Sequence, residues 1–177
     1  MGGTLHVSLL GGLTFGGVVT GTVLWSISGL LHGVPAIARA GILLVVAVTV
    51  LLRDTGTFDI RLPQARRQIT SGIFGRGRAR GLALFGFQLG TGVLTYLSAG
   101  APYVLATGLL VSALPYRGFV AAGVGFGLGR FAAPLSQSAD DLARWDARWL
   151  ARALWLVPVL SLAELVGWLS QVVFPTA

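Results

Sequence analysis

The chain has 177 residues, of which 54% are hydrophobic and only 11% are charged. Soluble domains carry about twice that share of charged residues, so the composition excludes an ordinary soluble globular domain. A net charge of +7 would suggest nucleic-acid binding in a soluble protein, but here the basic residues, all arginine, concentrate in one loop beside apolar stretches. Membrane topology and anionic lipid head groups account better for that distribution, so no nucleic-acid partner is predicted.

The residues that support most enzyme and metal chemistry are scarce. There is no cysteine, which excludes disulfides, thiol redox relays and zinc–thiolate sites. His6 and His32 lie at opposite ends of the first apolar stretch, so a histidine-built metal site is not expected. No pair of carboxylates and no nucleophile with a base lies within a span, so we expect neither an enzyme nor a bound cofactor.

The apolar stretches predict an all-α integral membrane protein, a single domain folded as a compact bundle of about six transmembrane helices. A spanning helix needs about 20 apolar residues, and most stretches reach or approach that length. The expected spans are residues 5–31, 36–52, 81–99, 101–114, 118–135 and 150–174. The segment 101–135 forms either two short spans or one re-entrant pair. Two spans are favoured because Arg117 then reaches the cytoplasmic side.

Glycines spaced four residues apart recur in the first and fifth predicted spans. The pairs are Gly12/Gly16, Gly17/Gly21, Gly123/Gly127 and Gly125/Gly129. Small residues at this spacing let two helices approach closely. The tract 123–129 looks like a nucleotide-binding loop, but no strand precedes it and it lies inside an apolar run, so helix packing is the prediction.

Residues 53–80 form the only long polar segment, and their excess of arginine predicts a cytoplasmic loop. With six spans both termini are then cytoplasmic, and the expected location is the plasma (inner) membrane of a bacterium. Residues 138–149 predict an amphipathic helix at the outer interface. The candidates for docking anionic lipid or a partner are Arg61, Arg66, Arg67, Arg76, Arg78, Arg80, Trp145 and Trp149. For the arginines the alternative is a topology anchor with no docking role.

The third predicted span carries no charge but has one polar face. Gln88, Thr91, Thr95 and Ser98 recur at steps of three, four and three, which places them on one side of a helix. In lipid such a face turns toward another helix or a water-filled path, because an unsatisfied polar group costs several kcal/mol. The face either forms hydrogen bonds between helices or lines a transport path.

Two ionisable residues, Arg130 and Glu164, lie within the fifth and sixth predicted spans. Because those spans run in opposite directions, the two side chains can lie at similar depth. Charged residues at this depth are costly and usually mark function. The interpretations are a structural ion pair, a transport or proton-relay element, and a contact of Glu164 with a partner subunit.

A shift of seventy residues aligns the first and third spans without a gap, with Phe15-Gly16 over Phe85-Gly86 and Ser28 over Ser98. The match is either an internal duplication or a chance likeness between two glycine-rich helices. Transporter folds are often built from such repeats, with the substrate site at the repeat interface.

Two segments, Phe85-Gly-Phe-Gln-Leu-Gly90 and Ser98-Ala-Gly-Ala-Pro102, resemble the six-span CcdA/DsbD-type thiol-electron transporters and, more distantly, the LysE-type exporters. The resemblance covers about a quarter of the chain and implies an inverted or repeated bundle. Ala101-Pro102 stands where that family has Cys-Pro, so electron transfer by that route is excluded. A likeness of fold does not carry function.

Two functions are therefore predicted. The first is a small-solute or ion transporter, or a transport component, whose path is lined by the polar face and whose charged element is Arg130 with Glu164. The second is a non-catalytic structural subunit or assembly factor of a larger membrane complex. The expected partners are the lipid bilayer, with its anionic head groups, and copies of the chain or other membrane subunits.

Overall fold

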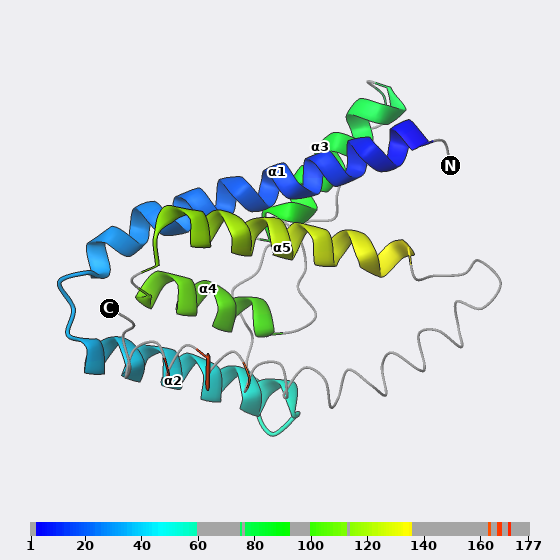
Figure 1. Cartoon of the computed structure of the whole chain (residues 1–177). Helices are drawn as coiled ribbons and strands as arrows, with labels where there is room; N and C mark the ends of the chain where they lie inside the picture. Colours follow the sequence, from blue (N-terminus) through cyan, green and yellow to red (C-terminus); the bar gives the residue numbers. More distant parts are fainter. Residues whose placement is uncertain are drawn as a thin grey trace. The chain divides into compact units, whose positions relative to one another are not determined.

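The computed structural model describes residues 3–59, 75, 77–92, 100–112, 114–135, 163, 166, 167 and 170. Over these residues the chain is all-α, and none of them lies in a strand (Figure 1). The helices are α1 (Gly3–Ser28), continued by the 3-10 turn η1 (Gly29–Leu31), α2 (Ala36–Asp54), α3 (Arg78–Gly90), α4 (Ala101–Val111) and α5 (Tyr116–Leu135). Most of the predicted loop 53–80, the whole of the predicted interfacial helix 138–149 and most of the predicted span 150–174 fall outside the described residues.

Two of the described helices are long and apolar enough to cross a membrane. They are Gly3–Leu31, with 29 residues, and Ala36–Asp54, with 19 residues. At about 1.5 Å per residue, either one covers the roughly 30 Å of a bilayer's hydrocarbon layer, or comes within a turn of doing so. They coincide with the first two spans expected from the sequence.

The third predicted span is not one continuous helix. Helix α3 starts at Arg78 and ends at Gly90, although the apolar sequence predicts helix through residue 99. The residue that ends it is Gly92, whose φ of +67° lies in the left-handed region. The N–H of Gly92 donates to the carbonyl oxygen of Leu89 at 3.2 Å, as at other glycine-terminated helix ends.

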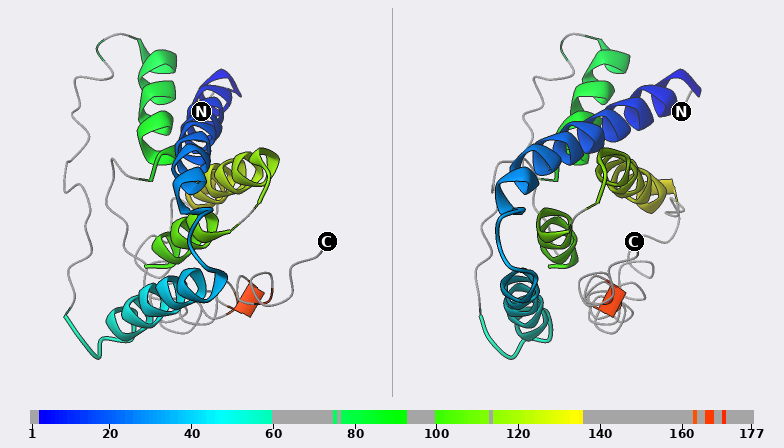
Figure 2. Two further views of the ribbon diagram at one scale, coloured as in Figure 1. Left: turned by 90° about the vertical axis from the view of Figure 1, so that its left-hand side faces the viewer. Right: turned by 60° about the vertical axis from the view of Figure 1, so that its left-hand side comes forward.

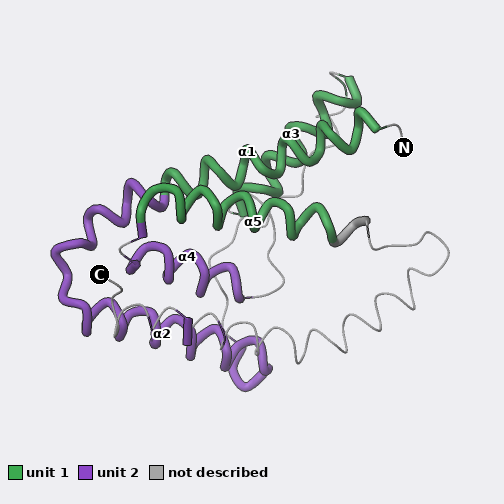
Figure 3. The backbone as a smooth tube through the Cα atoms, viewed as in Figure 1, with its two compact units in different colours: residues 1–23, 63–97, 115–140 green, residues 24–62, 98–114, 141–177 purple. Residues whose placement is uncertain are grey.

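The described helices belong to two compact units, which Figure 3 colours separately. Unit 1 comprises residues 1–23, 63–97 and 115–140, and it holds most of α1 together with α3 and α5. Unit 2 comprises residues 24–62, 98–114 and 141–177, and it holds α2 and α4.

In unit 1, α1 and α3 meet backbone to backbone through glycines. A Cβ added at Gly12 or Gly16 would lie under 3.0 Å from backbone atoms of α3, and one added at Gly86 or Gly90 would lie equally close to the backbone of α1. No larger residue fits at such a crossing without a shift of one helix. Residue numbers rise together along the contact, so α1 and α3 are parallel.

A second glycine face of α1 packs on α5. The contact pairs are Leu13 with Gly127, Gly17 with Gly123 and Gly21 with Phe119. Residue numbers rise along α1 while they fall along α5, so these two helices are antiparallel, as their opposite directions in Figure 2 also show. The predicted packing role is confirmed for three of the glycine pairs. At Gly125 and Gly129 an added Cβ would meet no described atom within 4 Å.

The direction of α5 corrects one part of the predicted topology. Six spans that alternate in direction make the first and fifth parallel, whereas α5 runs antiparallel to α1. In this direction Gly123 packs against Gly17, and Gly127 packs against Leu13, with backbone atoms in close contact.

In unit 2, α2 and α4 form an antiparallel pair with its own apolar core. Leu43, Ala47 and Val50 lie one turn apart on α2 and are buried against Val104 and Val111 of α4. This spacing is that of one helical face. Other faces of α2 carry exposed apolar side chains: Ile37, Leu44, Val45 and Val48.

Two substitutions on α5 test the glycine packing. Gly123→Ala adds a methyl group against the backbone of α1, and such overpacking costs about 1–3 kcal/mol. Gly125→Ala adds the same group two residues away, where the described structure has room. We expect Gly123→Ala to lower the midpoint of thermal unfolding in detergent and Gly125→Ala to leave it unchanged or raise it. Equal midpoints for the two variants would contradict the packing described for α1 and α5.

Candidate functional site

Both ends of α4 are held by charged side chains of α2. The Asp54 carboxylate accepts a hydrogen bond from the N–H of Gly100, with Oδ2 and N separated by 2.8 Å, at the start of α4. At the other end, Nη1 of Arg39 donates to the carbonyl oxygen of Val111 at 3.0 Å. An anion at a helix N-terminus and a cation at its C-terminus both complement the helix dipole. We call this pair of contacts the α4 clamp.

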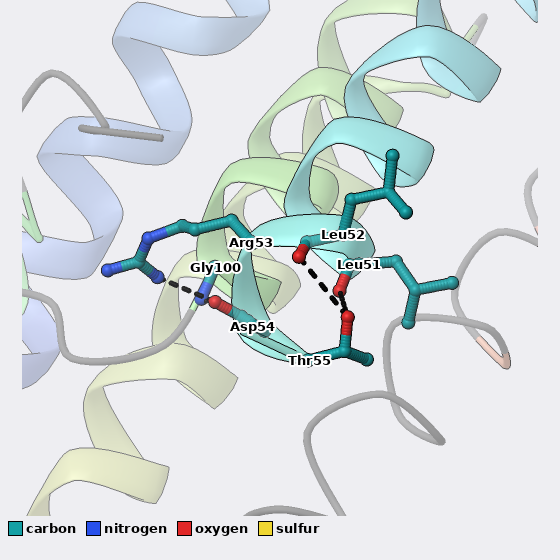
Figure 4. Close-up of polar contacts among 6 residues, drawn as sticks. All are labelled: Leu51, Leu52, Arg53, Asp54, Thr55 and Gly100. Atoms are coloured by element: carbon teal, nitrogen blue, oxygen red, sulfur yellow. Dashed lines mark hydrogen bonds and ion pairs between the residues drawn. The ribbon is translucent and has the colours of Figure 1, made fainter. Parts of the chain in front are cut away.

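The acidic end of the clamp is built by the way α2 terminates (Figure 4). Gly56 has a φ of +75°, and its N–H donates to the carbonyl oxygen of Arg53 at 2.9 Å. The N–H of Thr57 donates to the carbonyl oxygen of Leu52 at 3.0 Å, which completes a Schellman motif. This ending stops the helix directly after Asp54, so its carboxylate projects toward the start of α4.

The Asp54 carboxylate is almost fully enclosed by these contacts. Its side chain is 6% exposed, and Oδ1 lies 2.6 Å from Nη1 of Arg53. Gly100 approaches closely because it has no side chain, since an added Cβ would clash with Val50 and touch Asp54. With both of its oxygens engaged, this carboxylate holds the start of α4 against the end of α2.

The predicted polar face is only partly described, and its described half forms a helix end. The hydroxyl of Thr91 donates to the carbonyl oxygen of Gln88 at 2.8 Å. The hydroxyl of Thr20, on α1, donates to the carbonyl oxygen of Thr91 at 3.0 Å. Thr95 and Ser98 lie outside the described residues. Hydroxyl groups thus satisfy carbonyls that the end of α3 leaves without helical partners.

We call residues 88–92 the α3 break. Gly92 lies against the ring of Phe126 on α5, where an added Cβ would be 3.1 Å from one ring carbon. The hydroxyls of Thr22 and Tyr116 are 3.1 Å apart and tie α1 to the start of α5. The break thus contacts α1 through Thr20 and α5 through Phe126.

Arg130 lies on α5 beside the same aromatic ring. Its guanidinium carbon is 5.5 Å from the centre of the Phe126 ring, which is a cation–π distance. The side chain is half-buried, and its Nη1 is buried without a hydrogen-bond partner in the described part of the chain. Glu164 lies outside that part, so its predicted pairing with Arg130 stays a prediction.

The predicted docking residues are described at two positions only. Arg78 and Arg80 are exposed in the first turn of α3. The others fall outside the described residues: Arg61, Arg66, Arg67, Arg76, Trp145 and Trp149.

Sequence reasoning missed the α4 clamp. Neither Arg39 nor Asp54 was assigned a role from the sequence. A signal was present, because α2 carries Arg39 near its start and Asp54 at its end, with no charged residue between Arg39 and Arg53. It identifies no partner until the direction of α4 is known.

The chain was compared with protein-family models, curated proteins and solved structures, and none of them matches it. Its function is therefore argued from its own residues.

The acidic half of the α4 clamp has a direct test. Asp54→Ala leaves the N–H of Gly100 and the guanidinium of Arg53 without their acceptor, and unsatisfied buried donors cost about 1–3 kcal/mol each. Asp54→Asn keeps an acceptor oxygen and should cost less. Asp59→Ala, at an exposed position five residues on, is the matched control. Unfolding in detergent should rank Asp54→Ala least stable, and equal stability of the two alanine variants would refute the clamp.

Proposed function

We propose that this chain is an integral membrane protein that moves a small solute or ion across a bacterial inner membrane, alone or as a transport component. The observation that supports it best is the α3 break. The run from Gly81 to Val111 has no charged residue, yet helix stops at Gly90 and the next described helix starts at Ala101.

The long helices α1 and α2 expose apolar side chains, which favours a membrane location. Ile37 is 85% exposed and Val45 is 66% exposed on α2, and no charged residue lies between Arg39 and Arg53. On α1, Phe15 is 63% exposed. Monomeric soluble proteins rarely expose such contiguous apolar surface, whereas lipid is its natural neighbour. The arginine excess in residues 53–80 favours the cytoplasmic side for that loop.

A helix that ends inside a bilayer leaves backbone polar groups without helical partners, and this supports a transport function. Irregular backbone at membrane depth is tolerated only where it is buried in protein or lines a water-filled path. Helices interrupted at the midplane are the usual ligand-binding elements of secondary transporters. At the α3 break, carbonyl oxygens and the hydroxyls of Thr20 and Thr91 supply groups that could replace a solute's hydration shell.

The helix directions support a re-entrant connection between α3 and α5. Because α3 is parallel to α1 and α5 is antiparallel to it, α3 ends and α5 begins at the same end of α1. Helix α4 spans only about 16 Å at 1.5 Å per residue, less than the hydrocarbon thickness. A short helix in lipid needs its ends satisfied, and the α4 clamp does this.

Flux through reconstituted vesicles tests the proposal. Thr20→Val removes the hydroxyl that holds the α3 break and preserves the shape of the side chain. Loss of one hydrogen bond of about 1.4 kcal/mol corresponds to about a tenfold effect, so we expect flux to fall by about that factor. Thr49→Val is the control, because the hydroxyl of Thr49 donates to the carbonyl oxygen of Val45 within its own helix, away from the α3 break.

The assay measures the swelling of vesicles when glycerol, acetate or potassium is added outside. A pH-sensitive dye inside the vesicles reports proton movement. We expect the flux of at least one solute to exceed that of empty vesicles. This flux should be lower in Thr20→Val and unchanged in Thr49→Val. Equal flux in the two variants would remove the α3 break from the path. No flux above empty vesicles would contradict transport by the chain alone.

The second candidate function is a structural subunit or assembly factor of a larger membrane complex. The apolar face of α2, with Ile37 and Val45 exposed, would then cover a partner rather than lipid. Native mass measured after mild extraction from the original membrane separates the two. A fixed stoichiometry with other polypeptides favours the subunit, and the chain alone or with its own copies favours the transporter.

A further inference from the structure

We infer that Arg130 is the binding site for an anionic oxygen group, a carboxylate or a phosphate, and that the solute carried by this chain is accordingly an anion. The inference rests on the proposed transport function and adds the chemical class of its substrate. It depends on three observations, namely the position of Arg130 among apolar residues, the lack of a counter-charge among the described residues of its unit, and its neighbour at the α3 break.

The register of α1 and α5 places Arg130 within the apolar length of the unit. The pairs Leu13–Gly127 and Gly17–Gly123 define an antiparallel contact, and one more turn in that register brings Arg130 level with residues 9–10 of α1. Arg130 is thus flanked by apolar residues and lies five residues before the end of α5. An arginine side chain stays charged in proteins and has no acceptor atom, so at this depth it requires an anionic or polar partner.

The described part of unit 1 offers Arg130 no such partner. Nη1 of Arg130 is buried and makes no hydrogen bond there. No aspartate or glutamate lies among the described residues of the unit. The half-buried arginines of unit 2 differ, since Nη1 of Arg39 donates to Val111 and Nη1 of Arg53 to Asp54, although Nε of Arg39 is also buried and unpaired.

The aromatic ring of Phe126 connects Arg130 to the proposed path. The guanidinium lies 5.5 Å from the ring centre, and the same ring packs against Gly92 at the α3 break. A planar guanidinium fixed over an aromatic ring keeps its N–H groups directed outward in one plane, which suits bidentate binding of a carboxylate or phosphate. The cation and the interrupted helix therefore both contact the Phe126 side chain.

Anion binding to the purified full-length chain in nanodiscs of phosphatidylcholine tests this inference. The probes are acetate and inorganic phosphate, and the readouts are calorimetric titration and the shift in thermal unfolding. We expect Arg130→Gln to weaken binding by at least about tenfold, because charge-assisted bidentate hydrogen bonds are the strong ones. Arg117→Gln, at an exposed position on the same helix, should bind as the unmodified chain does.

Arg130→Lys is the control for a folding defect in Arg130→Gln. It keeps the positive charge and should retain weaker anion binding. Binding that survives unchanged in Arg130→Gln overturns the inference. Absence of binding to the unmodified chain overturns it as well, and if Glu164→Gln then creates binding, the chain's own carboxylate is the partner. Nanodiscs that contain phosphatidylglycerol separate the two sources of the anion. Competition by this lipid assigns the site to a head group, and undiminished acetate binding assigns it to a free solute.

The inference and the transport function fail separately. Anion binding that depends on Arg130, without flux in vesicles, keeps the site and contradicts transport. Flux of a neutral solute or a cation, without anion binding, keeps transport and contradicts the anion site.

Discussion

The close approach of α1 to two other helices is the contact on which unit 1 depends. Lipid tails are as apolar as the side chains of a membrane helix, so the hydrophobic effect does not favour contact between two such helices. Helices in a membrane associate instead through packing and hydrogen bonds. The two glycine faces of α1 give it backbone contact with α3 on one side and α5 on the other. Leu13 is 1% exposed and lies where both contacts meet.

Unit 2 depends on a different kind of contact, which satisfies the backbone groups at the ends of the short helix α4. An 11-residue helix has few internal hydrogen bonds relative to its unsatisfied ends, and in an apolar medium each unsatisfied group is expensive. Asp54 and Arg39 meet this need with charges placed where the dipole of α4 favours them. Glycine recurs at these junctions, because Gly56 ends α2 and Gly100 lets α2 approach the start of α4.

The sequence predicts what depends on composition and spacing. The all-α class, the first two long helices and three of the glycine pairs follow from apolar length and from four-residue steps. The break after Gly90 does not follow, because glycine is frequent within membrane helices as well as at helix ends. The direction of α5 and the α4 clamp depend on which elements meet, and no local pattern encodes this. At the candidate site, the sequence singles out Gln88, Thr91 and Arg130 as polar residues in apolar surroundings, but it does not single out their neighbours Thr20 and Phe126.

The most direct test of this account is the side of the membrane on which each helix of unit 1 begins. The chain has no cysteine, so single cysteines placed at the exposed positions Thr4, Arg78 and Arg117 can be labelled with a membrane-impermeant maleimide in oriented vesicles. With α1 and α3 parallel and α5 antiparallel across a bilayer, Thr4→Cys and Arg78→Cys should react from one side and Arg117→Cys from the other. Reaction of all three from the same side would restore strictly alternating spans and contradict the arrangement described here.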